Sequence, residues 1–285
     1  MVTIDSQAIV SHHAKLGRNV SIGPFCKIEA DVEVGDDCSL ASHVVLKNGT
    51  TLGSNNRIYE GCILGGAPQH TRAPERIGRL VIGSNNTIRE NCTLHCALQE
   101  GVATTIGDHN LLMVGTHIAH DCHLGNQIVI ANNTLLAGHV SIDDRAFISG
   151  AVGVHQFCRI GSLAMVGGHA RVVQDIPPYV MIDGGSGCIV GLNLVGLRRG
   201  GFSAGEIASL KSAYRLIYRR GLTWNQVLEQ LKVEFAHGPA ANFYEFFSKG
   251  TRGFVQERRM PPGATLKLRR ASDDEDGQHL QFKAG

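Results

Sequence analysis

The chain has 285 residues, of which 43% are hydrophobic, only 18% are charged and 35 are glycine. A formal net charge of +2 does not indicate a nucleic-acid-binding protein, and no segment has the length and purity of a membrane span. The opening residues, MVTIDSQAIV, lack the basic start and long apolar core of a signal peptide. We therefore expect a cytoplasmic protein whose eight cysteines are free thiols.

An aliphatic residue recurs at every sixth position from Ile4 to Val172, except at His70, Arg76 and Glu100. A period of six matches neither an α-helix nor a plain alternating strand, but it is typical of a triangular parallel β-helix with three hexads per coil. The aliphatic residue fills the interior, and a glycine often follows it at a tight corner. We therefore predict a β-helix over residues 1–190, in which residues eighteen apart lie one above the other at about 4.8 Å.

The three exceptions fall in two segments that replace hexads without shifting the register, so we predict loops near residues 66–79 and 96–105. Six cysteines occupy the slot four residues after a repeat position, where small apolar residues also recur: Cys26, Cys38, Cys62, Cys92, Cys122 and Cys158. We interpret these six as small core residues rather than nucleophiles. Cys96 and Cys188 are out of phase, and no specific role is predicted for either.

The segment HIAHDCH, at residues 117–123, concentrates groups that can ionise or bind metals. An eighteen-residue coil places Gly138 above His120 and Gln156 above Gly138. The resulting corner column contains His120, His139, His155 and Gln156. Histidines that converge in this way can bind a metal ion with an open coordination position. Alternatively, His120 is a general base held by Asp121, and the Gly138 N–H stabilises an oxyanion.

The pattern becomes helical after about residue 190. Capping boxes at Ser203–Glu206 and Thr223–Gln226 open two helices, and a third is predicted from Pro239. We therefore predict a helical C-terminal domain over residues 191–255 and a polar, flexible tail over 256–285. Residues 191–260 hold eleven Lys/Arg against five Asp/Glu, which fits either a solvated helix face or a surface that binds an acidic protein or a phosphorylated ligand.

Several segments, including HIAHDC, NNTLLAGHV, GVHQFCRIG, QDIPPYV and GLNLVGLRRGGFS, closely resemble the cytoplasmic UDP-N-acetylglucosamine O-acyltransferases of lipid A biosynthesis, over residues 1 to about 254. The resemblance implies an all-β left-handed parallel β-helix followed by a small all-α domain. It implies a homotrimer with active sites between neighbouring β-helices. It also implies transfer of a 3-hydroxyacyl chain from acyl carrier protein to the glucosamine 3-hydroxyl of UDP-N-acetylglucosamine, the first step of lipid A biosynthesis, without a cofactor or metal. The basic helical domain then corresponds to a dock for acyl carrier protein.

On this sequence the resemblance assigns His120 as the general base, Asp121 as its orienting partner and the Gly138 amide as the oxyanion donor. The implied substrate-binding residues are Gln69, His70, Arg72, His117, His139, His155, Gln156, Asn193 and Arg199. Met165 and Gly168 are implied to line the acyl-chain groove, and a glycine there leaves room for a long chain. His70 departs from the aspartate common in the family, and Arg72 departs from a lysine.

Three alternatives remain open at this stage. The first is a metal-dependent carbonic anhydrase of the trimeric β-helix type, with His117, His120 and His123 as ligands. The second is a variant acyltransferase that uses a 3-amino sugar nucleotide, since His70 departs from the family pattern. The third is a structural β-helix or a scaffold that binds acyl carrier protein, which would leave the histidine column unexplained.

Overall fold

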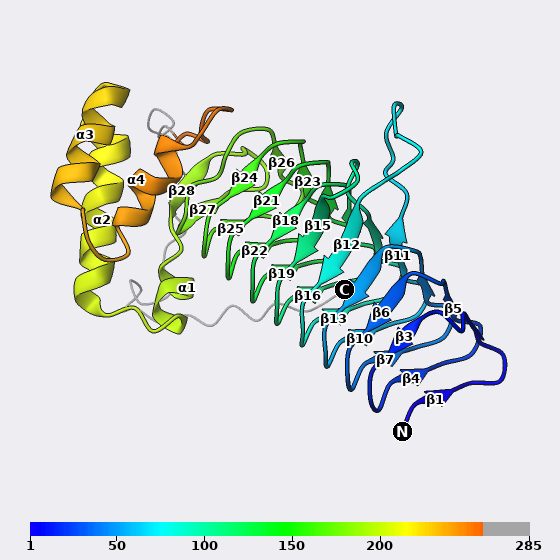
Figure 1. Cartoon of the computed structure of the whole chain (residues 1–285). Helices are drawn as coiled ribbons and strands as arrows, with labels where there is room; N and C mark the ends of the chain where they lie inside the picture. The colour runs from blue at the N-terminus through cyan, green and yellow to red at the C-terminus, as the bar shows by residue number, and fades with distance from the viewer. Residues whose placement is uncertain (259–285) are drawn as a thin grey trace, which may run out of the picture.

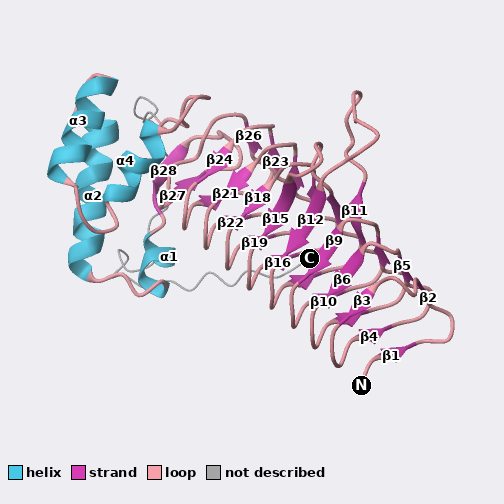
Figure 2. Ribbon diagram, in the orientation of Figure 1, coloured by secondary structure: helices cyan, strands magenta, loops and turns pink. Residues whose placement is uncertain are grey.

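The computed structural model describes residues 1–258, in which a long three-sided β-helix is followed by a cluster of short helices (Figure 1). The N-terminus lies at one end of the β-helix and the helices lie at the other, so the two modules follow one another along the chain (Figure 2). The predicted tail falls, from residue 259 onward, outside the described residues.

Each side of the β-helix is one sheet of short strands. Sheet A has the order β1 (Thr3–Ile4), β4 (Ser21–Ile22), β7 (Ser39–Leu40), β10 (Arg57–Ile58), β13 (Thr87–Ile88), β16 (Leu111–Leu112), β19 (Val129–Ile130), β22 (Phe147–Ile148), β25 (Met165–Val166), β27 (Val180–Ile182) and β28 (Ile189–Leu192). Sheet B has the order β2 (Ile9–Val10), β5 (Lys27–Ile28), β8 (Val45–Leu46), β11 (Ile63–Gly66), β14 (Thr93–His95), β17 (His117–Ile118), β20 (Leu135–Leu136), β23 (Gly153–Val154) and β26 (Arg171–Val172). Sheet C has the order β3 (Lys15–Leu16), β6 (Val32–Val34), β9 (Thr50–Leu52), β12 (Arg79–Ile82), β15 (Ala103–Ile106), β18 (His123–Leu124), β21 (Ser141–Ile142) and β24 (Arg159–Ile160). Within each sheet the pairing is parallel, except that β28 returns antiparallel to β27.

The strand register confirms the predicted parallel β-helix with eighteen residues in a regular coil. Thr3 pairs with Ser21 and His117 with Leu135, so residues eighteen apart lie side by side in adjacent coils. The repeat-position side chains fill the interior, where Leu64 and Ile118 are completely buried. The six cysteines predicted as core residues are also buried, and burial raises the pKa of the Cys122 thiol to about 12, which favours the protonated, unreactive form.

The two loops lengthen individual coils without changing which side chains face inward. Across the first loop, between β11 and β12, Ile58 pairs with Ile88; across the second, between β14 and β15, Ile82 pairs with Ile106. In both pairs the separation in sequence exceeds eighteen residues by a multiple of six, so the aliphatic positions stay in register.

The corners of the coils need two different backbone features. At Gly35 an added Cβ would lie 2.6 Å from the carbonyl carbon of Gly53 in the next coil, so the stacked corners admit no side chain there. Other corner residues have left-handed backbone, among them Asp121 with φ 59° and His139 with φ 60°. Aspartate and histidine are among the residues that tolerate this conformation best, which helps to place them at this corner.

The helical module begins directly after β28. It contains α1 (Leu194–Arg199), α2 (Ala204–Arg219), α3 (Trp224–Glu234) and α4 (Ala241–Ser248). The predicted capping box at the start of α2 is present, since the Ser203 hydroxyl accepts from the Glu206 N–H and Glu206 accepts from the Ser203 N–H. None of the helices described in residues 1–258 is long and apolar enough to cross a membrane.

A second apolar core joins the helices to the last coils. It centres on Phe243 of α4, which is fully buried, and includes Leu210 of α2 and Leu231 of α3. Leu163 and Tyr179 extend this core into the β-helix. The helical module is therefore packed on the end of the β-helix nearest to the histidine column.

Candidate active site

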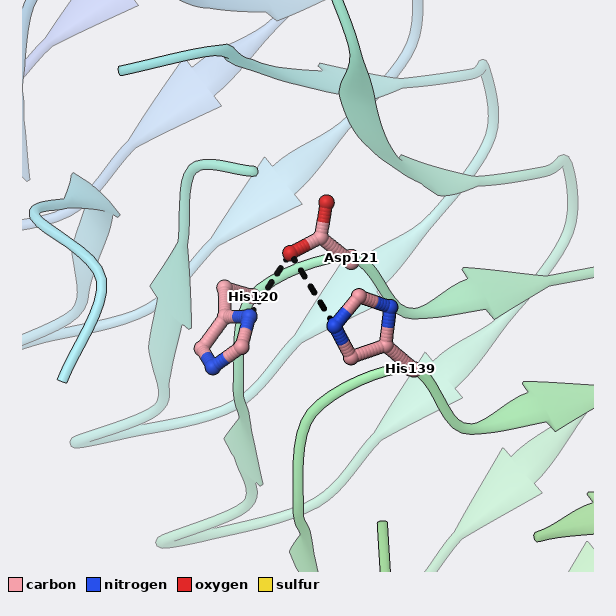
Figure 3. Close-up of side chains that lie close together, drawn as sticks. All are labelled: His120, Asp121 and His139. Atoms are coloured by element: carbon pink, nitrogen blue, oxygen red, sulfur yellow. Dashed lines mark hydrogen bonds and ion pairs between the residues drawn. The ribbon is translucent and has the colours of Figure 1, made fainter. Parts of the chain in front are cut away.

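His120 and Asp121 form the centre of the site at the corner between β17 and β18 (Figure 3). His120 Nδ1 lies 2.7 Å from Asp121 Oδ2, and both side chains are almost completely buried. An ionised carboxylate can only accept, so Nδ1 carries the proton and donates it to Asp121. The other ring nitrogen of His120, Nε2, is thereby left unprotonated and able to accept a proton.

Asp121 is itself held by two contacts from the preceding coil. Its N–H donates to Thr104 Oγ1 at 2.8 Å, and its Oδ2 accepts from the Leu98 N–H at 3.1 Å. The second loop, which carries Leu98, thus helps to fix the carboxylate. Such a fixed acceptor holds the imidazole in one tautomer and one orientation.

Gly138 lies one coil above His120 and packs against its ring. A Cβ placed on Gly138 would lie 2.7 Å from His120 Cε1 and 2.9 Å from Nε2. Only a glycine lets the imidazole approach the backbone this closely. In residues 1–258 the Gly138 N–H donates to no acceptor, so it is free to bind a ligand oxygen beside Nε2.

A cleft of about 510 Å³ opens in front of His120. It contains seven of the predicted residues: Gln69, His70, His117, His120, Gly138, His155 and Gln156. The spacing of eighteen therefore brings together side chains that lie far apart in the sequence. Apolar groups, including Leu135 and Val173, form much of the remaining wall.

The first loop folds back over the histidine corner and brings His70 next to His120. The two ring centroids are 5.6 Å apart and the rings are perpendicular. His70 Nδ1 accepts from the Arg72 N–H at 3.0 Å, so His70, when neutral, carries its proton on Nε2. Arg72 is exposed and does not line the cleft.

The neighbouring histidines are held neutral by their surroundings. Burial lowers the pKa of His117, which lies in the cleft, and burial also lowers the pKa of His139 although Asp121 opposes the shift. The His139 ring stacks on Phe157 with centroids 4.6 Å apart. His139 thus packs beside Asp121 and does not line the cleft.

A metal site was the competing interpretation of this histidine cluster. Among the described residues, His120, Asp121 and His139 are close enough to share an ion. However, the 2.7 Å between His120 Nδ1 and Asp121 Oδ2 is a hydrogen-bond distance, and it already occupies the nitrogen that would face the ion. The trio predicted for a carbonic anhydrase is not assembled, because His117 bonds to Thr93 on sheet B and His123 to Thr105 on sheet C.

Four other predicted residues lie outside the cleft. Asn193 is buried at the start of α1, where its side chain accepts from the Gly196 N–H and donates to the Leu163 carbonyl. Arg199 ends α1, and Met165 and Gly168 belong to sheet A and the turn after it. None of these four residues lines the cleft within one chain.

Three residues near the cleft were missed by sequence reasoning. Arg171 lines it, three coils above His117 in the same column of sheet B, so the hexad register could have revealed it. His95 is buried beside His117 and its Nδ1 donates to the Ala67 carbonyl at 2.7 Å, at the start of the first loop. Arg252 reaches the cleft from the C-terminal module, and no repeat spacing predicts that contact.

The coils and the carboxylate-held histidine define a transferase of the hexapeptide-repeat class. Residues 13–48 match the family model for the bacterial transferase hexapeptide, with six repeats. Residues 175–255 match the second domain of UDP-N-acetylglucosamine O-acyltransferase.

Full-length relatives and solved structures agree with these matches. The chain is 45% identical over 258 residues to the acyl-[acyl-carrier-protein]–UDP-N-acetylglucosamine O-acyltransferase of Ectopseudomonas mendocina, covering 90% of this chain and all of the relative. It is similar to the crystal structures of UDP-N-acetylglucosamine acyltransferase from Francisella novicida (TM-score 0.86, 34% identity, 94% of this chain and 100% of that one) and of LpxA from Acinetobacter baumannii (TM-score 0.85, 41% identity, 89% and 99%). The chain belongs to the UDP-N-acetylglucosamine O-acyltransferase family.

Proposed function

We propose that this enzyme transfers a 3-hydroxyacyl chain from acyl carrier protein to the 3-hydroxyl of the glucosamine ring in UDP-N-acetylglucosamine, the first step of lipid A biosynthesis. The observation that carries the proposal is the buried His120–Asp121 pair beneath the free Gly138 N–H. Its family membership supports the identity of both substrates.

The chemistry follows from the tautomer of His120. Nε2 takes the proton of the acceptor hydroxyl as its oxygen attacks the thioester carbonyl carbon. The negative charge that develops on the carbonyl oxygen is stabilised by the N–H of Gly138, a residue that lines the cleft and whose N–H has no acceptor in residues 1–258. When the C–S bond breaks, the protonated Nε2 returns its proton to the leaving thiolate, so His120 ends the cycle as it began. Asp121 stabilises the transient imidazolium without taking its proton.

The remaining cleft residues bind and orient the substrates in this proposal. Gln69, His70, His117, His155 and Gln156 offer hydrogen-bond donors and acceptors that suit a sugar nucleotide. Arg72 on the exposed first loop is placed to contact phosphate with its planar guanidinium. We propose that the reaction uses no metal or cofactor, with His120 Nδ1 donating to Asp121 and Nε2 acting as the base.

We propose a homotrimer in which a neighbouring copy completes each site. Outward side chains of sheet A form an apolar column of Leu111, Val129, Phe147, Met165 and Met181, which is suited to a subunit contact. Asn193, Arg199 and Gly168 lie off the cleft of their own chain, so a second copy could present them to it. The acyl chain would then run beside Met165 and Gly168, with no side chain at Gly168 to block it.

We propose that acyl carrier protein, which is acidic, docks on α2. Lys211, Arg215 and Arg219 surround a small cleft of about 210 Å³ between α2 and the end of β28. Arg219 is paired with Glu257 at 2.6 Å, whereas Lys211 and Arg215 form no ion pair within residues 1–258. Unpaired cations of this kind steer an acidic partner and speed its association. We place the enzyme in the cytoplasm, together with this carrier.

A product assay tests the proposal. UDP-N-acetylglucosamine and its 3-amino analogue are each offered with a set of 3-hydroxyacyl-acyl carrier proteins, in the presence of a chelator. The products are identified by mass spectrometry. His120→Ala removes the base and should lower kcat by about 10²–10⁴-fold. His123→Ala is the matched control, because His123 lies in the same segment but on sheet C, away from the cleft. An His120→Ala enzyme with wild-type turnover would refute the mechanism, and activity lost with the chelator would favour a metal enzyme.

A further inference from the structure

The segment that follows α4 returns to the β-helix and reaches the wall of the cleft. The Asp175 N–H donates to the Gly253 carbonyl and the Val255 N–H donates to the Asp175 carbonyl, both at 3.0 Å, so this segment is attached to the last coil by backbone bonds. From there the Arg252 side chain extends inward. Its Nη2 lies 3.2 Å from Nδ1 of His155, a residue of the cleft, and 3.4 Å from the Val173 carbonyl.

Two contacts of His155 Nδ1 make opposite demands on the position of its ring proton. A guanidinium only donates, so Nδ1 must accept when this bond forms. The same Nδ1 lies 3.2 Å from the backbone carbonyl of Gln156, a contact that would instead require a proton on Nδ1. The two interactions exclude each other. A bond from Arg252 requires Nδ1 without a proton and Nε2 with one, whereas a bond to the Gln156 carbonyl requires the proton on Nδ1.

We propose that Arg252 is a positioning residue that holds His155 as the Nε2–H tautomer, so that this N–H can donate to a substrate oxygen in the cleft. The inference rests on the proposed function, since it assigns His155 to substrate binding. One atom of the half-buried side chain supports it: the Arg252 Nε is buried and has no partner among the described residues, which is destabilising. An arginine that served only to anchor the segment would not need to leave this N–H group buried and unpaired.

A purely structural role for Arg252 is the competing explanation, and Arg159 supplies a matched control for it. Arg159 also ties the helical module to the β-helix, through the Phe246 carbonyl at 2.9 Å and Asp175 Oδ2 at 2.8 Å. Its side chain lies on sheet C and does not line the cleft that contains His155. Arg159→Ala should therefore weaken the attachment of the module without changing the tautomer of His155.

The experiment measures the tautomer directly, by long-range ¹H–¹⁵N NMR of histidine-labelled protein, with His155 assigned by its loss in His155→Gln. We expect the wild-type enzyme and Arg159→Ala to show a protonated Nε2, and Arg252→Ala to show a protonated Nδ1. Arg252→Ala should also lower kcat/KM by about tenfold, the effect of losing one substrate hydrogen bond. Guanidinium at tens of millimolar should restore both the tautomer and the activity of this variant, but should not affect Arg159→Ala.

Two results would overturn the inference: a wild-type enzyme with its proton on Nδ1, or an Arg252→Ala variant whose tautomer is unchanged. A loss of activity in Arg252→Ala that guanidinium does not rescue, with the tautomer unchanged, would assign the residue a structural role only. The NMR measurement needs no turnover. A tautomer that changes as expected in a protein that transfers no acyl group would therefore refute the proposed function while leaving the role of Arg252 in place.

Discussion

Replacing Gly138 with alanine should disable the enzyme by moving His120 rather than by removing any functional group. The new Cβ would lie 2.7 Å from His120 Cε1, whereas ordinary van der Waals contact begins near 3.4 Å, so the ring must move by about 0.7 Å. This movement directs Nε2 away from the acceptor hydroxyl and strains the 2.7 Å bond from Nδ1 to Asp121. A misplacement of this size at a reacting centre costs about 10²-fold in rate, which we expect to see in kcat.

Steady-state kinetics with a saturating carrier thioester would measure this loss, and thermal unfolding would show whether the fold survives. Gly138 does not have a positive φ, so alanine is compatible with the backbone there. Gly205→Ala in α2 is the matched control, because nothing lies within 4 Å of its added Cβ. If Gly138→Ala kept kcat within about threefold of wild type while Gly205→Ala behaved normally, the placement of His120 against this backbone would not matter to catalysis and our reasoning would be wrong.

Three further predictions concern other parts of the molecule. Burial lowers the pKa of His95 below its usual 6.5, so the unfolded state binds more protons and the free energy of unfolding falls as the pH drops below 6.5. His95→Gln should reduce this dependence of the unfolding free energy on pH by up to about 1.4 kcal/mol per pH unit. Urea unfolding at a series of pH values from 7 to 5 would measure the change. Gly168→Leu should shift the preferred acyl chain to a shorter one, measured by competition between carrier thioesters; an unchanged preference would place the chain elsewhere. The double variant Lys211→Glu and Arg215→Glu should raise KM for the acyl carrier protein by about tenfold at low salt, without changing KM for the sugar nucleotide. An equal rise in both KM values would argue against docking on α2.

The β-helix could be predicted from the sequence because its structure repeats. Each hexad has the same local environment, so one inward residue per hexad determines the register, and Gly138 could be placed above His120 by counting alone. The same counting correctly placed His155 and Gln156 near His120. It could also have identified Arg171, had the column above His117 been followed upward.

The parts that could not be predicted are those where the chain stops repeating. The position of His70 against His120 depends on how the first loop folds over the corner, and no periodicity in the sequence encodes that fold. Helix α1, the antiparallel return of β28 and the contact between Arg252 and His155 depend likewise on single packing arrangements. The residue pattern of the histidine corner suggested both a metal site and a general base, and the family resemblance favoured the base. The 2.7 Å bond from His120 to Asp121 agrees with that interpretation.

Because both loops preserve the six-residue phase, the length of this chain upstream of Cys158 can change only in discrete steps. Loss of a single residue between Ile130 and Ile142 would shift the later residues by one position in the coil, so side chains at interior positions would change face and His155 would lose its alignment with the column that contains His120. Gain or loss of a complete eighteen-residue coil on the N-terminal side of β13 would instead lengthen or shorten the β-helix and leave the reacting groups in place. Natural variation in this architecture should therefore accumulate as whole turns at the N-terminal end, while frame-altering losses near the middle are eliminated.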